Sequence, residues 1–309
     1  MIEPTDGSFK ALLPHFGIER PCHWEGVFKR RAPLTVEIGF GLGEILLKKA
    51  AEHPEGDFIG IENHWERICK TLRRIEKAPS GLPNVRILRL DATVAFERLF
   101  DEKTIDHIYS LFPCPWPKKK HIKHRLFSRH SLKLLNSRLK SGAQFYVVSD
   151  YYPYIEWIRE ESRGSGFSLE EKSARTSFDT KFEKKWRGEG QEMFFELLLT
   201  KTRHIHMPVK KDVLLKHYKI EGFDPARFKL EPKKTAATIV YKHMNYDEAK
   251  KEALIHTIVA EENLTQHFWI MVKKNDKGWI IKPMEGHYFF PTTGIAEALR
   301  AVYLSAKKT

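Results

Sequence analysis

Three glycines at two-residue spacing follow a short apolar run and precede a helical pattern. Glu37 lies in the run at 34–38, and Gly39, Gly41 and Gly43 come directly after it. A strand that turns sharply into a helix needs glycine, and the missing side chains also let a ligand approach the backbone closely. Because the turn alone would explain the glycines, the loop is a candidate nucleoside-binding loop only if other residues support it.

Two carboxylates stand where a nucleoside would meet them. Glu62 ends the second apolar run, about 20 residues after the loop, where a carboxylate can accept hydrogen bonds from both ribose hydroxyls. Asp91 follows the third run. NAD-binding folds share a glycine loop and an acid, but the order here is Glu-x-Gly-x-Gly-x-Gly and not Gly-x-Gly-x-x-Gly. Each acid alone would pass for a helix cap; their order after successive runs favours a nucleoside site.

A rigid, strongly basic segment follows the fourth apolar run. Residues 112–117 read Phe-Pro-Cys-Pro-Trp-Pro, and the eight residues 118–125 contain five Lys or Arg and two His. Proline fixes the backbone and removes hydrogen-bond donors, so the first part predicts a preorganised loop. The second part carries enough charge to contact several phosphates, although a solvated helix start would also be basic. An exposed Trp beside the loop favours a binding surface.

These residues need a scaffold that brings the ends of successive strands together. Short apolar runs alternate with helical patterns, which is typical of a parallel sheet with helices on both faces. We therefore predict an α/β, Rossmann-like domain. Its strands are expected at 34–38, 57–61, 84–90, 104–112, 143–149 and 192–202, and its helices at 44–52, 64–77, 126–139 and 152–162.

The chain is long enough for two domains. Residues 1–32 are interpreted as an N-terminal arm without assigned structure, 33–203 as the α/β domain, and 204–309 as a smaller α+β domain. In the last segment four strand-like runs, a hairpin turn at 275–278 and an amphipathic helix at 294–308 are expected. Its aromatic residues are predicted to form a core rather than a base-stacking platform: Phe268, Trp269, Trp279, Phe289 and Phe290.

Composition favours a polyanionic partner. The formal net charge is +13, which indicates nucleic acid before a membrane surface, and no apolar run approaches the roughly 20 residues that span a bilayer. The amino terminus lacks the apolar stretch of a secretory signal, so a cytoplasmic protein is expected. Cys22, Cys69 and Cys114 show no paired spacing, so neither disulfides nor a metal site are predicted. A monomer is favoured.

The motifs together resemble a known family. The glycine loop and the two acids are similar to the class I S-adenosylmethionine methyltransferases. The run 112–125 resembles the F-P-D-P-W-P-K-x-x-H-x-x-x-R motif of the bacterial tRNA (guanine-N7)-methyltransferases. Residues 24–34, Ser149-Asp150 with Tyr154, and 180–190 resemble further segments of that family, with Arg187 one residue further along. The resemblance covers roughly residues 24–200.

The resemblance implies an enzyme that transfers a methyl group from S-adenosylmethionine to N7 of a guanine in tRNA, in the variable loop. It implies cofactor contacts from Glu37, Gly39, Gly41, Gly43, Glu62, Asn63, Asp91, Ala92 and the loop residue Cys114. It implies guanine or nucleotide contacts from Lys118, Asp150, Thr180 and Glu183, with Lys119, Lys120, His121 and Arg125 along the RNA strand.

One position departs from the family pattern. Cys114 stands where the family has an Asp between two prolines, and a largely neutral thiol cannot stabilise a developing cation as a carboxylate would. Guanine N7 has a lone pair in the neutral base, so its attack needs no general base. Asp150 and Glu183 are the acids that could compensate, and these two and Cys114 are the predicted catalytic positions.

Two other functions remain open at this point. The chain could be an RNA-binding protein that keeps the cofactor fold but has lost catalysis, or a methyltransferase that acts on another RNA or on a small molecule. The segment 180–190 argues against the second of these alternatives. The role of residues 204–309 stays open.

Overall fold

The computed structural model describes residues 9–14, 18–78, 81–174, 188, 194–286 and 288–308. The chain forms two compact units, Met1–Lys210 and Lys211–Thr309. Residues 204–210, which the sequence pattern had assigned to the second domain, belong with the first unit. Lys210 contacts Glu97 there, with 2.8 Å between its Nζ and the carboxylate. Among the described residues, no helix is both long and apolar enough to cross a lipid bilayer.

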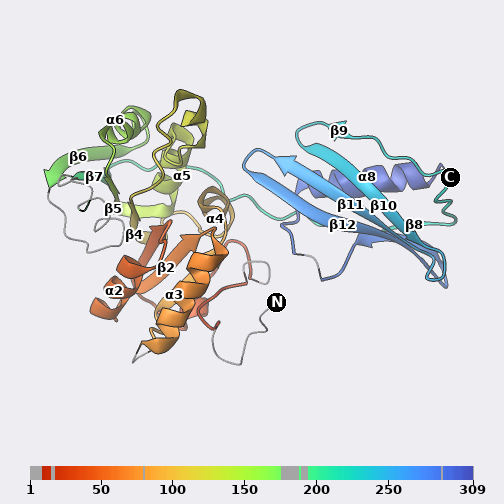
Figure 1. Ribbon diagram of the computed structural model, residues 1–309, viewed down its shortest axis with the longest axis horizontal. Coiled ribbons are helices and arrows are strands. Elements are labelled where there is room, and N and C mark those ends of the chain that lie inside the picture. The colour runs from red at the N-terminus through yellow and green to blue at the C-terminus, as the bar shows by residue number, and fades with distance from the viewer. Residues whose placement is uncertain are drawn as a thin grey trace. The chain divides into compact units, whose positions relative to one another are not determined.

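The first unit is built on a seven-stranded sheet with the order β3-β2-β1-β4-β5-β7-β6 (Figure 1). Strands β1 to β5 pair in parallel, whereas β7 is antiparallel to both β5 and β6. The strands are β1 Leu34–Ile38, β2 Asp57–Glu62, β3 Val85–Arg89, β4 Ile105–Leu111, β5 Leu139–Ser149, β6 Phe167–Ala174 and β7 Phe194–Lys201. The strand order reverses between β1 and β4, which is where open α/β sheets place their ligands.

Helices cover both faces of this sheet. Every residue of β1 and β2 is buried, which is expected only when both faces are packed. The helical elements are α1 Trp24–Phe28, α2 Glu44–Glu52, α3 Trp65–Lys77, α4 Ala92–Arg98, the 3-10 helix η1 Lys119–His124, α5 Arg129–Arg138 and α6 Tyr152–Glu161. The predicted α/β fold is thus confirmed.

Apolar spacing explains how these helices dock. Ile68, Leu72 and Ile75 recur at steps of four and three residues, so they share one face of α3, and all three are buried against β2 and β3. The helix predicted at 126–139 begins later, because Ser128 caps its first turn by accepting a hydrogen bond from the Ser131 N–H.

Four elements and one pairing in the first unit were not predicted, the elements being α1, α4, η1 and β6. Helix α4 has only seven residues, and β6 is a polar edge strand, so neither has a clear apolar period. In the N-terminal arm, Leu13 N–H donates to the carbonyl of Ile87 and Ile87 N–H donates to that of Ala11. The arm thereby continues the sheet beyond β3.

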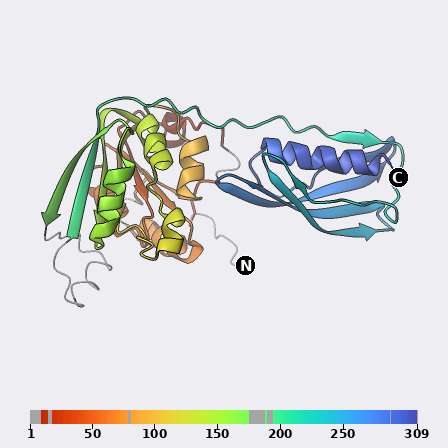
Figure 2. The same ribbon diagram turned by 90° about the horizontal axis from the view of Figure 1, so that it is seen from above.

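The second unit is a six-stranded sheet with the order β8-β13-β12-β11-β10-β9, and α8 lies along one of its faces (Figure 2). All pairs are antiparallel. Its elements are β8 Tyr218–Ile220, β9 Lys233–Lys234, β10 Thr238–Asp247, β11 Glu252–Glu261, β12 Leu264–Asn275, β13 Gly278–Pro283 and α8 Thr293–Ala306. The predicted hairpin turn is present, with Asn275 opposite Gly278.

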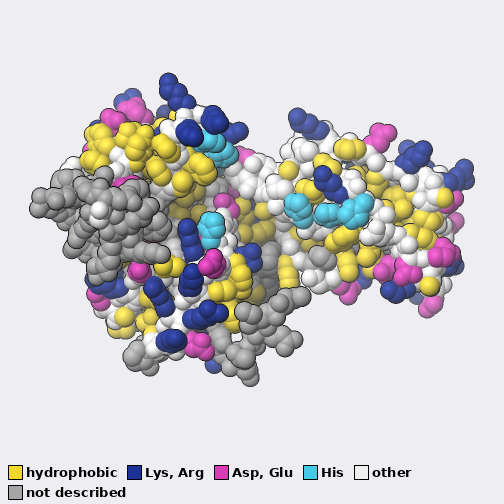
Figure 3. Space-filling view, in the orientation of Figure 1, with side chains coloured by type: hydrophobic (Ala, Val, Ile, Leu, Met, Phe, Trp, Pro, Cys, Tyr) yellow, Lys and Arg dark blue, Asp and Glu magenta, His cyan; other side chains and the backbone are white. Residues whose placement is uncertain are grey.

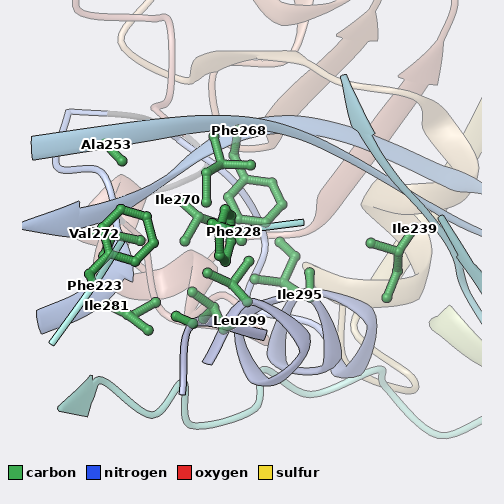
Figure 4. Close-up of a cluster of buried hydrophobic side chains, with 14 of the residues drawn as sticks. Phe223, Phe228, Ile239, Ala253, Phe268, Ile270, Val272, Ile281, Ile295 and Leu299 are labelled. Atoms are coloured by element: carbon green, nitrogen blue, oxygen red, sulfur yellow. The ribbon is translucent and has the colours of Figure 1, made fainter. Parts of the chain in front are cut away.

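The core of the second unit lies between the sheet and α8. Phe268 and Ile270 of β12 point into the same cluster as Ile295 and Leu299 of α8 (Figure 4). Phe268, Trp279 and Phe290 are buried, as predicted for a core, and Phe289 packs against the cluster. Trp269 differs: it stacks on His256, at 5.0 Å between ring centroids. Because residues alternate along β12, Trp269 lies on the face opposite Phe268.

The absence of a side chain at Gly60 lets α2 and the glycine loop pack closely on β2. A Cβ built there would lie 2.6 Å from both Leu46 Cδ2 and Phe40 Cδ1. We expect Gly60→Ala to lower the free energy of unfolding by about 1–3 kcal/mol, as overpacking of a close-packed core does. Denaturant unfolding measures the change. Gly26→Ala is the control, because a Cβ at Gly26 meets nothing within 4 Å; equal stability of the two variants would contradict this packing.

Candidate active site

A cleft of about 570 Å³ opens at the carboxyl ends of β1 to β5. This volume lies in the range of small-molecule sites. Nine of the predicted site residues line it, from five successive strand ends: Glu37, Gly39, Gly41, Glu62, Asn63, Asp91, Ala92, Cys114 and Asp150. The topology therefore brings together residues that are more than 100 positions apart in sequence.

The glycine loop has the backbone conformation that its composition predicts. Gly39, Gly41 and Gly43 have φ angles of 71°, 58° and 70°, in the left-handed region. A Cβ at Gly39 or Gly41 would meet no atom within 4 Å, so these two glycines leave open space beside the cleft. At Gly43 a Cβ would lie 2.5 Å from Thr71 Cγ2, so this glycine is also required for packing against α3.

Glu62 joins the glycine loop to the end of β2. Its Oε2 accepts a hydrogen bond from Gly41 N–H at 3.2 Å, and its Oε1 accepts from the N–H groups of Asn63 and His64 at 2.8 and 3.0 Å. Arg67 approaches Oε2 at 3.5 Å. The carboxylate is 6% exposed and lines the cleft. Its position and orientation are therefore fixed before any ligand arrives.

Asp91 is an N-cap as well as a cleft residue. Its Oδ1 accepts from Thr93 N–H at 2.9 Å and Val94 N–H at 3.2 Å, which satisfies two donors at the start of α4. Ala92 is buried next to it and also lines the cleft. The capping role explains the position of Asp91, and it leaves Oδ2 outside these two capping bonds.

Glu37 lies at the floor of the cleft and is 3% exposed. Burial raises its pKa to about 8, against the opposing effects of Lys49, the Leu46 backbone and the Tyr109 hydroxyl. The same burial, together with Glu37, raises the pKa of Tyr109 well above its ordinary value. The carboxyl group is therefore largely protonated at neutral pH in the absence of a ligand.

The proline-rich loop forms the opposite wall. Phe112 and Trp116 have φ angles of 52° and 42°, which are strained values for bulky residues. Pro113, Cys114 and Pro115 line the cleft between them, and Cys114 is exposed. Strain of this kind is held by the surrounding structure and is concentrated at functional sites.

Arg125 supports this loop from within the protein. Its Nε donates to the Pro115 carbonyl at 2.9 Å, and its guanidinium lies over the rings of Tyr154 and Trp157 at 5.3 and 5.1 Å. The residue is only 8% exposed. Its charge is therefore used to hold the loop, a role that the basic sequence pattern did not predict.

The remaining basic residues of the segment lie on the surface. Lys118, Lys119 and Lys120 are exposed, and His121 is half-buried beside Trp116, at 5.7 Å between ring centroids. None of these four lines the cleft, whereas Trp116 and His124 do. In Figure 3, lysine, arginine and histidine side chains gather beside α5. The segment thus presents positive charge next to the cleft.

Asp150 comes directly after the last residue of β5. It is half-buried and lines the cleft. Burial raises its pKa, with an opposing effect from a backbone hydrogen bond. A carboxylate in such a place favours a neighbouring cation. Thr180 and Glu183, the other predicted substrate residues, lie outside the described residues.

Arg67, Ser110 and Trp116 are among the lining residues that were not predicted as site residues. Arg67 approaches Glu62, Ser110 Oγ donates to the Ile38 carbonyl at 3.0 Å, and the Trp116 ring lies 5.3 Å from that of His124. The sequence predicts an exposed Trp116, without a role in the cleft. Arg67 and Ser110 carry no signal of their own, since a surface Arg on a helix and a Ser in a strand are common.

Known proteins with similar sequences are named methyltransferases. Residues 31–196 match the family described as "Putative methyltransferase". A tRNA (guanine-N(7)-)-methyltransferase of Chlorobium phaeobacteroides is 43% identical over 59% of this chain and 89% of its own length. The proteins of that name from Aquifex aeolicus and Thermotoga maritima are 30% and 26% identical, and the matches cover 80% and 91% of this chain and 85% and 92% of theirs.

The lengths of these matches differ in an informative way. The 183 matched residues are 89% of the Chlorobium protein, so the remainder is too short to contain an equivalent of the second unit. The Thermotoga match extends over 297 residues and includes this part of the chain.

The crystal structure of the 16S rRNA methyltransferase KamB matches 58% of this chain and 93% of its own, at 16% identity and a TM-score of 0.47.

The buried carboxyl group of Glu37 predicts a pH-dependent stability. Because its pKa is about 8 in the folded state and about 4.5 when unfolded, the stability that it contributes is complete below pH 4.5 and is lost as pH rises through 8. We expect Glu37→Gln to stabilise the ligand-free protein increasingly from pH 5 to 8, at a limiting slope of about 1.4 kcal/mol per pH unit. Denaturant unfolding at several pH values measures this; a pH-independent difference between the two proteins would refute it.

Proposed function

Because this chain belongs to the family of the tRNA (guanine-N7)-methyltransferases, we propose that it transfers a methyl group from S-adenosylmethionine to N7 of a guanine in tRNA. The observation that carries the proposal is the single cleft that joins the glycine loop, Glu62, the proline-rich loop and Asp150. We further propose that the guanine lies in the variable loop and that the protein acts in the cytoplasm as a monomer.

The residues on the glycine side of the cleft fit S-adenosylmethionine. Open space lies beside Gly39 and Gly41, and the oriented Glu62 carboxylate can accept hydrogen bonds from the two ribose hydroxyls. Asp91, Ala92 and Asn63 would hold the adenosine part, and Glu37 and Gly43 would support the loop beneath it. When bound, the cofactor supplies an electrophilic methyl group on a sulfonium.

The residues on the other side would orient the guanine. Its N7 carries a lone pair in the neutral base, so the protein need not remove a proton before transfer. The protein's contribution is to hold N7 in line and to stabilise the positive charge that the base acquires. We propose that Asp150, a carboxylate that lines the cleft, serves this purpose together with Glu183. Acidic oxygens also accept the N1 and amino protons of guanine, which would select this base.

The exposed basic segment would bind the RNA backbone. Lys118 to Lys120 and His121 lie beside the cleft, where phosphates that flank the target nucleotide would pass. Arg125 would act indirectly, because it is buried and holds Pro115. Thr180 is proposed to contact the target nucleotide. In this proposal the acidic residues select the base, and the lysines provide affinity for the RNA backbone.

Methylation of tRNA tests the reaction directly. We expect the purified protein, labelled S-adenosylmethionine and unmodified tRNA to give N7-methylguanosine after digestion to nucleosides. A transcript made with 7-deazaguanosine lacks N7 and should accept no label. Absence of transfer would favour an RNA-binding protein without catalysis, and label only on another substrate would move the target elsewhere.

The role of Glu62 has its own test. Glu62→Gln should weaken S-adenosylmethionine binding by about 10- to 100-fold, because hydrogen bonds to a charged group contribute about 1.5–3 kcal/mol. Calorimetric titration measures the affinity. Glu66→Gln is the matched control, since Glu66 lies four residues further on, is exposed and pairs with Lys70. An unchanged affinity in Glu62→Gln would remove this carboxylate from the cofactor site.

Cys114 can be exchanged for the family's acid. The side chain is exposed on the cleft wall, so the loop has room for a carboxylate. We expect Cys114→Asp to retain or raise kcat, because a carboxylate stabilises the cationic product better than a thiol. Cys114→Ser should leave kcat near that of the parent. Complete loss of turnover in Cys114→Asp would show that the family pattern does not apply to this loop.

A further inference from the structure

Glu102, His204 and His206 converge in the first unit, although about 100 residues separate the acid from the histidines. Glu102 precedes β4, and both histidines follow β7. One oxygen, Glu102 Oε2, lies 3.5 Å from His204 Nε2 and 3.0 Å from His206 Nδ1. We propose that these three side chains form a binding site for a divalent transition-metal ion, with zinc as the first choice. The proposal does not depend on the proposed function.

The distances between the side-chain atoms fit a tetrahedral ion. Zinc binds imidazole nitrogen and carboxylate oxygen at about 2.0–2.1 Å, so neighbouring ligand atoms around it are about 3.3 Å apart. The two distances from Glu102 Oε2 lie on either side of this value. All three ligand atoms lie within 4.8 Å of one another. An ion could therefore replace the ring protons that the carboxylate now faces, with small side-chain movements.

Other hydrogen bonds already orient the ligands. Glu102 Oε1 accepts from the Ser137 hydroxyl and from Met207 N–H at 2.8 Å, which turns Oε2 toward the imidazoles. The second ring nitrogen of His204 lies 3.0 Å from Lys201 Nζ. Lys201 is itself held by the carbonyls of Asn136 and Leu139. The contacts of Glu102 Oε1 are of the kind that fix metal ligands. Lys201 would turn away from His204, because a neutral imidazole that binds an ion through Nε2 carries its proton on Nδ1.

The ligand types and their exposure decide the kind of ion. Two imidazoles with one carboxylate suit zinc and related transition metals better than magnesium or calcium, which prefer oxygen ligands. Glu102 and His204 are about a quarter exposed, whereas the His206 side chain is 72% exposed. An ion can thus enter from the His206 side, with water as the fourth ligand.

A bound ion would fasten the segment after β7 to the start of β4. None of the three residues lines the cleft, so the site is structural in character. Metal binding stabilises the folded state when the unfolded chain lacks the preformed site. The segment 204–207 leads toward the second unit, and an ion would fix where this connection leaves the first unit's sheet.

Calorimetric titration of the metal-free, untagged protein with zinc chloride tests the site. We expect about one equivalent to bind and the Tm to rise with zinc. His206→Ala and Glu102→Gln should each weaken zinc binding by at least about 100-fold. Loss of a hydrogen-bond partner of a metal ligand already lowers metal affinity by about 10- to 100-fold, and these variants remove a ligand itself. Cobalt chloride should give tetrahedral absorption bands in the parent and not in His206→Ala. His206 is exposed, so its variant should keep the parent's Tm without metal.

Two control variants separate this site from other histidine and cysteine groups. His256 lies between His243 and His267 on the second sheet, and Cys114 is an exposed thiol in the first unit. His256→Ala and Cys114→Ser should bind zinc as the parent does. The proposal is overturned if the parent binds no zinc, if His206→Ala and Glu102→Gln bind it unchanged, or if either control variant abolishes binding.

Discussion

The bonds of the Glu62 carboxylate hold the candidate active site together. One side chain accepts hydrogen bonds from the N–H groups of Gly41, Asn63 and His64, so the glycine loop after β1 and the turn after β2 share a single anchor. A loop of three glycines is flexible by itself, because glycine loses the most conformational freedom on folding. The buried carboxylate compensates by fixing the loop from one side, and it faces the cleft on the other.

The proline-rich loop obtains its rigidity in a different way. Its prolines limit the backbone, and Arg125 binds it from behind through Pro115 while its guanidinium rests on two aromatic rings. A buried Arg with these contacts can hold two unusual φ values in place. The two walls of the cleft are thus preorganised by charges of opposite sign, one acidic and one basic, and both are largely removed from solvent.

The parallel strands of the first unit and the acids at their ends could be predicted from the sequence, since local patterns determine them. Buried parallel strands give continuous apolar runs, and acids at their ends mark the ligand edge, so β1, β2, Glu62 and Asp91 were found where they lie. The burial of Arg125 was missed, because a basic run looks the same whether its last residue points outward or inward. The cluster of Glu102 with His204 and His206 was missed because only the folded chain brings these distant residues together.

Other features lay beyond any local pattern. The pKa of Glu37 depends on how completely the neighbouring helices exclude water, and nothing in the run 34–38 records this. The short helix α4 and the polar strand β6 are stabilised by their neighbours rather than by their own composition. Thr180 and Glu183 lie outside the described residues, so their part in the site rests on the family alone.

Among the described residues, one hydrophobic cluster draws its buried side chains from residues 11–87 and another from residues 220–306. A unit that completes its own core can be joined to or deleted from a gene without unfolding its neighbour. The Chlorobium relative is too short to hold full counterparts of both units, because its match of 183 residues is 89% of its length. A connection between two self-contained units therefore permits relatives of different length.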